Sequence, residues 1–155
     1  MVLNKIRDWF EASGVPYREA HHEPTRTSEE SARARGEELK VGGKALLIKV
    51  DSTFRLFVLS ADRKLDSAAI KQYFGAKKTR FATPEELHQM SGLVPGCVPP
   101  FGEPILPFPL YVDPSVLENA KVAFNAGSLT DSMIIAIEDY RRLASPEVFR
   151  FAAEG

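Results

Sequence analysis

Lys44 is a candidate for anion chemistry because of where it stands in the sequence. It opens an apolar run over residues 44–50, directly after Gly42 and Gly43. In an extended strand, alternation places Lys44 on the same face as Leu46. An ammonium at the mouth of an apolar face can reach into a pocket and pair with a phosphate or a developing oxyanion. A solvated lysine that simply starts a strand is the alternative interpretation.

A proline-rich loop is the second candidate. It runs Gly96-Cys97-Val98-Pro99-Pro100-Phe101-Gly102, and six of the eleven prolines of the chain fall between Pro95 and Pro109. Glycine lets the backbone approach a ligand closely, and proline fixes φ and stiffens the segment. Such a loop can present N–H groups to a carbonyl oxygen without supplying an acid or a base. An ordinary tight turn between two strands fits the same spacing.

The cysteine and the histidines offer weaker candidates. Cys97 could be a nucleophile with a histidine as its base, but no local pattern ties it to one, and a lone cysteine is more often a small buried hydrophobe. It cannot form an internal disulfide. His21 and His22 are adjacent, so a strand would point them to opposite faces, which disfavours a shared metal ion. We therefore expect no metal site.

The charge balance limits what the chain can bind. Twenty Lys and Arg residues against 21 Asp and Glu give a net charge of −1, which excludes a strongly basic nucleic-acid binder and leaves such contacts to a local patch. Lys71, Lys77, Lys78 and Arg80 form one basic cluster, which could touch a phosphate backbone or could be a solvated face. The sequence contains no membrane-spanning run and no signal peptide, so we expect a cytoplasmic protein.

The elements that must position these residues follow from capping and periodicity. We expect helices over residues 3–13, 28–35, 67–74, 84–91 and 138–143, and strands over 16–21, 44–50, 54–60, 77–81, 121–124 and 133–137. The strands of the hairpin 44–60 are apolar on both faces, so they should be covered on both sides. This mixture without strict β-α-β alternation predicts an α+β fold: a single domain over residues 1–155, with a mixed, mostly antiparallel central sheet flanked by helices.

Taken together, the motifs resemble a known family. His22-Glu23-Pro24-Thr25 precedes a capped helix, Gly43-Lys44 opens an apolar strand, Gly96 to Pro100 forms a Gly-x-x-x-Pro loop, and a late strand runs into Ala126-Gly127-Ser128. This order resembles the YbaK/ProX family of aminoacyl-tRNA deacylases, relatives of the editing domain inserted in bacterial prolyl-tRNA synthetase. The resemblance spans residues 3–145, and it rests on the order and spacing of the motifs rather than on any one of them.

The resemblance implies a free-standing trans-editing hydrolase that needs no metal or other cofactor. Its substrate would be the ester of a small noncognate amino acid (alanine, serine, threonine or cysteine) at the 3′ acceptor end of a mischarged tRNA, and an aminoacyl-tRNA synthetase is a further possible partner. The site lysine of the family matches Lys44, and the loop matches Gly96 and Pro100; we assign these three residues to catalysis. The expected substrate-binding residues are His22, Thr25, Cys97, Val98, Pro99, Phe101, Gly127 and Ser128.

Two other hypotheses remain from the residues. A non-catalytic module of the same fold, docking on a tRNA or a synthetase, would need the basic cluster at Lys71 to Arg80 but not Lys44. A thiol enzyme would need Cys97 and a histidine within hydrogen-bond reach.

Overall fold

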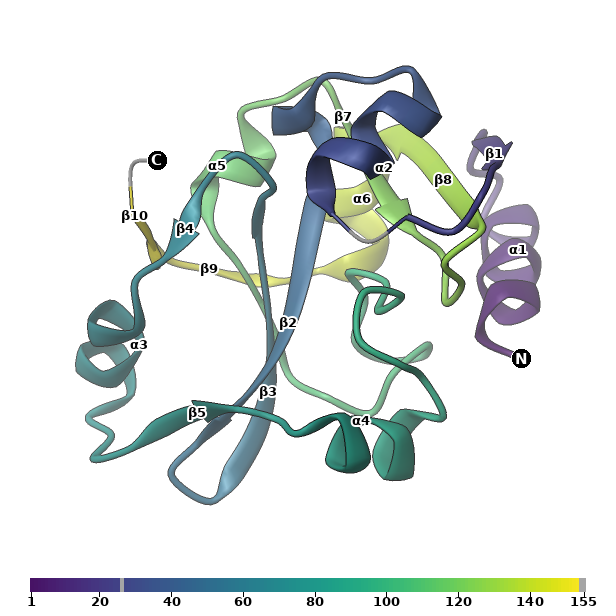
Figure 1. The fold of residues 1–155 in the computed structure, drawn as a ribbon. Coiled ribbons are helices and arrows are strands. Elements are labelled where there is room, and N and C mark those ends of the chain that lie inside the picture. The colour runs from purple at the N-terminus through teal and green to yellow at the C-terminus, as the bar shows by residue number, and fades with distance from the viewer. Residues whose placement is uncertain (26, 154–155) are drawn as a thin grey trace.

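A five-stranded mixed sheet forms the centre of the molecule. The computed structural model describes residues 1–25 and 27–153. The sheet has the order β5-β2-β3-β6-β9, with β2 antiparallel to β3 and β5, and β6 parallel to β3 and β9 (Figure 1). Its strands are β5 (Thr79–Phe81), β2 (Gly43–Val50), β3 (Thr53–Ser60), β6 (Leu110–Val112) and β9 (Glu147–Val148). The predicted α+β fold with a mixed sheet is confirmed.

A second, antiparallel sheet lies against the start of β2. It has the order β1-β8-β7, and an isolated bridge between Gly42 and Ala123 joins it to the central sheet. Its strands are β1 (Arg18–His21), β8 (Asp131–Ala136) and β7 (Lys121–Asn125). A short pair, β4 (Lys64–Leu65) with β10 (Ala152–Ala153), completes the strands of the described residues. The bridge places the end of β7 close to the beginning of β2.

Three of the helices, over residues 28–35, 67–74 and 84–91, begin and end where their caps predict. The helices are α1 (Val2–Ala12), α2 (Ser28–Arg35), η1 (Leu39–Val41, a 3₁₀ turn), α3 (Ser67–Phe74), α4 (Pro84–Ser91), α5 (Pro114–Leu117) and α6 (Ile137–Ala144). Thr27 caps α2 by accepting a hydrogen bond from the Glu30 N–H, and Gly36 ends it in the left-handed conformation. Both bounds of α2 and of α3 agree with the sequence prediction. Of the described helices, none is long and apolar enough to cross a membrane.

Helices cover both faces of the central hairpin, as the apolar pattern of β2 and β3 predicts. One core contains Leu47 and Val58 and extends to α1 and α4, and the other contains Ile48 and Phe57 and extends to α3. In Figure 1, α3 lies on one side of the hairpin, and α1 and α4 lie on the other. This packing fixes the hairpin, and therefore the position of Lys44 at its end.

The predicted strand over residues 77–81 was too long, and some short elements were not predicted. Only Thr79–Phe81 is a strand, because the backbone N–H groups of Lys77 and Lys78 donate to the Asp51 carboxylate instead of to a neighbouring strand. The unpredicted elements are η1, β4, β6, α5, β9 and β10. They contain two to four residues each, too few to show a period of apolar residues.

Candidate active site

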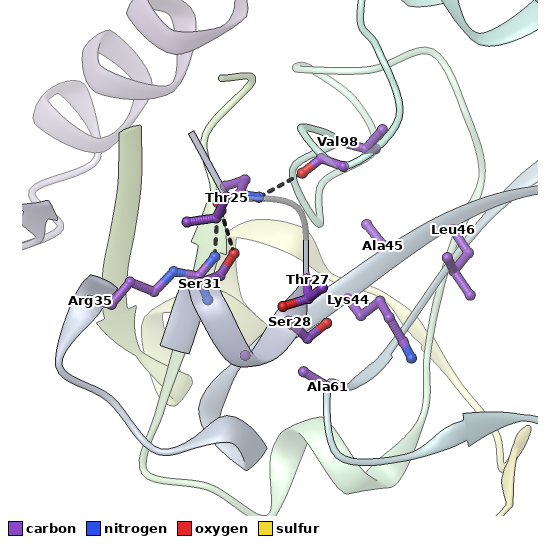
Figure 2. A pocket seen from close by; sticks show the side chains of 14 residues that line it. Thr25, Thr27, Ser28, Ser31, Arg35, Lys44, Ala45, Leu46, Ala61 and Val98 are labelled. Atoms are coloured by element: carbon purple, nitrogen blue, oxygen red, sulfur yellow. Dashed lines mark hydrogen bonds between the residues drawn. The ribbon is translucent and has the colours of Figure 1, made fainter. Parts of the chain in front are cut away.

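A polar cavity opens at the start of β2. Its volume is about 230 Å³, and it lies between the beginning of α2, the first strand residues of β2 and the Gly96 loop (Figure 2). β5 pairs only with Ile48 to Val50, so it leaves the edge of β2 near Lys44 unpaired. The lining residues are Thr25, Thr27, Ser28, Ser31, Arg35, Gly42, Gly43, Lys44, Ala45, Leu46, Ala61, Gly96, Val98 and Asn125.

Lys44 places a half-buried ammonium on the wall of this cavity. Its Nζ donates to the Arg63 carbonyl oxygen at 3.1 Å, and its other two N–H bonds have no partner among the described residues. Burial lowers the pKa of Lys44, and the charge of Glu29 partly opposes this shift. A desolvated ammonium with two unused donors can bind a phosphate or carbonyl oxygen of a ligand.

A row of hydroxyl groups from α2 and the segment before it forms the opposite part of the lining. It contains Thr25, Thr27, Ser28 and Ser31. The Thr25 and Ser31 hydroxyls share a hydrogen bond of 2.7 Å, and Thr27 caps the helix. Figure 2 shows Thr27 and Ser28 beside Lys44. This wall can hydrogen-bond a small polar group.

Arg35 contributes a buried guanidinium that has no carboxylate partner. The residue is only 8% exposed, and no ion pair within residues 1–25 and 27–153 involves it. Its Nε donates to the Ser132 hydroxyl at 2.9 Å and its Nη2 to the Asn125 side-chain oxygen at 3.0 Å. Burial lowers the pKa of Arg35 to about 10. Its direct hydrogen-bond acceptors are therefore neutral groups, and the charge of Glu37 partly opposes the lowering of its pKa.

Asn125 connects Arg35 to the Gly96 loop. While its Oδ1 accepts from Arg35, its Nδ2 donates to the Gly96 carbonyl oxygen at 2.6 Å. Gly96 has φ +91°, a conformation that favours glycine, and its N–H has no hydrogen-bond partner in the described part of the chain. The arrangement thus holds one peptide of the loop by its carbonyl and leaves the Gly96 N–H available to a ligand.

The comparisons with known proteins agree with this geometry. A family model described as an aminoacyl-tRNA editing domain matches residues 22–143. The chain belongs to this family. It is 35% identical over 144 residues to the multifunctional Ser/Thr-tRNA deacylase ProXp-y of Escherichia coli (strain K12), covering 89% of this chain and 85% of that protein.

Two further similar proteins, one of them a solved structure, have names that refer to the enzyme that charges tRNA with proline. The proline–tRNA ligase of Shouchella clausii is 31% identical over 101 residues, which are 65% of this chain and 18% of the ligase. A crystal structure of a proposed trans-editing enzyme for prolyl tRNA synthetase superimposes with a TM-score of 0.85 at 25% identity, covering 98% of this chain and 97% of that one. The resemblance inferred from the motifs is therefore confirmed.

The editing domain brings four of the expected site residues together at the cavity. Thr25, Lys44, Gly96 and Val98 line it, and Val98 lies across from Thr25 in Figure 2. His22 does not line it, but its Nε2 lies 2.9 Å from the Ser132 hydroxyl, one contact away from Arg35.

Three expected residues belong to the loop but do not line the cavity. Cys97 is 3% exposed, its thiol donates to the Val94 carbonyl, and burial raises its thiol pKa. The Pro100 carbonyl accepts from the buried Tyr140 hydroxyl at 2.7 Å, and the Pro99 side chain is buried.

The other three also pack around the loop. Phe101 is fully buried, and its ring packs edge-on against Phe10 and Phe124. The Gly127 N–H donates to the Cys97 carbonyl at 3.0 Å, and the Ser128 hydroxyl donates to Asp131.

Sequence reasoning missed three polar residues of this site: Arg35, Asn125 and Ser132. Arg35 reads as a basic residue at the end of a helix, and Asn125 as the first residue of a turn. Arg35 lies 97 positions from Ser132 and 90 from Asn125. A local sequence pattern cannot predict a contact between residues that are so far apart in the chain. The one feature of the sequence that could have indicated a site residue is the position of Asn125, which directly follows an apolar strand and precedes Ala126-Gly127.

Proposed function

We propose that the editing domain hydrolyses, in trans, the ester between a noncognate serine or threonine and the 3′-terminal ribose of a tRNA. The observation that carries the proposal is one cavity lined by Lys44, the Gly96 loop and four hydroxyl side chains. The E. coli relative is itself named a Ser/Thr-tRNA deacylase. Alanine, which the sequence also allows, has no side-chain hydroxyl to hydrogen-bond this wall, and the thiol of cysteine is only a weak donor.

The chemistry requires little from the protein, because an aminoacyl ester is already activated. A water molecule, positioned by the neighbouring ribose hydroxyl, attacks the carbonyl carbon and gives up a proton, and the carbonyl oxygen becomes an oxyanion. The ester C–O bond then breaks, and the ribose oxygen leaves with that proton. The Gly96 N–H is suited to donate to that oxyanion, and the Lys44 ammonium to hold the 3′ end or to share the charge. In the described part of the chain, no carboxylate or imidazole lines the cavity, so positioning and electrostatics carry this mechanism.

The hydroxyl wall gives a physical basis for selecting serine or threonine. A site that hydrogen-bonds a substrate hydroxyl favours a substrate that carries one over an analogue that lacks it. Of the four hydroxyl residues, Ser31 is buried and Thr27 is exposed. The volume of about 230 Å³ suits a small side chain. A second sieve of this kind admits small amino acids, which a synthetase discriminates weakly.

The test is deacylation of a panel of labelled tRNAs mischarged with alanine, serine, threonine or cysteine. We expect wild type to turn over the seryl or threonyl ester and Lys44→Ala to lose that activity. Lys64→Ala, which removes an exposed lysine outside the cavity, is the matched control and should keep it. Binding of these tRNAs without turnover would refute the proposal and favour the non-catalytic module.

A further inference from the structure

A second, strongly basic cavity lies at the far end of β2. Its volume is about 380 Å³, and it lies where the turn of the β2–β3 hairpin meets α3 and β5 (Figure 1). We refer to it as the basic groove. Its lining residues are Lys49, Asp51, Lys71, Lys77, Lys78, Thr79 and Arg80.

The charges of the basic groove are largely uncompensated. Its single carboxylate, Asp51, accepts the backbone N–H groups of Lys77 and Lys78, each at 3.0 Å. Arg80 pairs with Glu86 at 2.8 Å. The four lysines of the groove make no ion pair with any described residue. Since the whole chain carries a net charge of −1, the groove is a local concentration of positive charge.

The basic groove and the candidate active site lie along the same edge of the central sheet. β5 is the edge strand beside the groove, and it pairs with β2 only from Ile48 onwards, so the same edge is open at Lys44. Lys44 and Lys49 are five residues apart, which at a rise of about 3.3 Å per residue separates them by about 17 Å. A few stacked nucleotides span this distance, at roughly 3.4 Å per nucleotide along a helix axis.

We propose that the basic groove binds the phosphate backbone of the acceptor arm of a tRNA whose aminoacyl end occupies the candidate active site. This inference rests on the proposed function and adds a second contact surface to it. Lys71, Lys77 and Lys78 are exposed and come from two segments of the groove, α3 and the residues just before β5. Exposed ammonium groups make point-charge contacts with successive phosphates, which fit a backbone of any sequence better than one small anion.

The experiment compares one ester on two carriers. The seryl ester is presented on a full-length tRNA and on a trinucleotide that ends in the same aminoacyl adenosine. The test variant is Lys77→Glu/Lys78→Glu, and the control is Lys5→Glu/Arg141→Glu, which makes the same charge change at exposed residues of α1 and α6. The Asp51 contacts to residues 77 and 78 involve backbone N–H groups, so the test variant keeps them. Thermal unfolding verifies that both variants are folded.

We expect the test variant to raise KM for the full-length tRNA at least about tenfold at low salt, with the difference shrinking as salt rises. The slope of log kcat/KM against log salt should flatten by about one for each phosphate that the variant no longer binds. Activity on the trinucleotide should not change, and the control variant should behave as wild type.

The outcomes separate this inference from the proposed function. Unchanged KM and salt slope for the full-length tRNA in the test variant, with wild type active on both carriers, overturn the basic groove as an RNA surface and leave the hydrolase intact. Equal slowing on both carriers also overturns it, because a backbone contact outside the trinucleotide cannot act there. Wild type that hydrolyses neither carrier refutes the proposed function itself. If a folded variant is not obtained, the salt slope of wild type on the two carriers decides, since only the full-length tRNA should show the steeper slope.

Discussion

The substitution Asn125→Asp should lower the activity of the site without lowering the stability of the fold. The substitution is nearly isosteric, and the new carboxylate can still accept the hydrogen bonds that Arg35 Nη2 and Ser132 Oγ donate to Asn125 at 3.0 and 3.2 Å. It cannot donate to the Gly96 carbonyl, which Asn125 holds at 2.6 Å. Two acceptor oxygens would then face each other, so the loop must move.

The two effects have opposite signs. The hydrogen bond from Arg35 to Asn125 already has a charged donor, so it falls in the range of about 1.5–3 kcal/mol. An anionic acceptor moves it toward the upper end of that range and stabilises the fold by up to about 1 kcal/mol. Burying the new charge offsets part of this gain, so we expect stability equal to wild type or slightly higher. Without the hydrogen bond that holds the loop, the transition state should be destabilised by about 1–3 kcal/mol, which is roughly 5- to 150-fold in kcat/KM.

The assay pairs thermal unfolding with deacylation kinetics, and Asn125→Ala is the matched control. The alanine variant removes all three hydrogen bonds of the Asn125 side chain and leaves Arg35 Nη2 without its acceptor, so it should lose about 1–3 kcal/mol of stability as well as activity. Wild-type kcat/KM in Asn125→Asp would refute the idea that Asn125 positions the Gly96 loop. Equal destabilisation of the two variants would refute the account of Arg35.

Three further predictions concern residues of the site and of the core around it. Because burial lowers the pKa of Lys44 below 10.5, kcat/KM should fall with rising pH at that lowered value, and Lys44→Arg should shift the fall to higher pH. Between its lowered pKa and 10.5, Lys44 holds its proton more in the unfolded chain than in the folded one, so the free energy of unfolding of wild type should rise with pH relative to that of Lys44→Met. Cys97→Ala should keep kcat/KM within about twofold and contradict the thiol hypothesis, since burial raises the thiol pKa and the cysteine packs as a hydrophobe. Phe101→Ala should cost about 3–5 kcal/mol in denaturant unfolding, and a destabilisation below about 1 kcal/mol would contradict its place in the core.

The fold was predictable where local rules decide it. Thr27 and Gly36 bound α2, and Asp66 and Gly75 bound α3, because capping depends on residues within one turn of the helix end. The β2–β3 hairpin was predictable for the same reason, as its two apolar runs flank a short polar turn. The prediction failed where pairing is distant: β6 pairs with β3 more than 50 positions away, and its own sequence is too short to show a pattern.

The residues of the candidate site likewise include some that local sequence predicts and some that only distant contacts reveal. Lys44 and Gly96 were predictable from their own neighbourhoods, a glycine pair before a strand and a loop that prolines stiffen. Arg35 and Asn125 were not, because their function depends on contacts with each other across 90 positions. A helical arginine is ordinarily solvated, and only the fold shows that this one is buried against neutral acceptors at the cavity.

The loop itself explains how residues that never touch the cavity can still belong to the motif. Its carbonyl oxygens at Gly96, Cys97 and Pro100 each accept a hydrogen bond, from Asn125, the Gly127 N–H and the Tyr140 hydroxyl in that order. These donors come from three different parts of the fold, so the loop is held along its length. Glycine and proline at the two ends of the motif therefore set the backbone geometry, and the hydrogen bonds to its carbonyl oxygens hold that geometry in place.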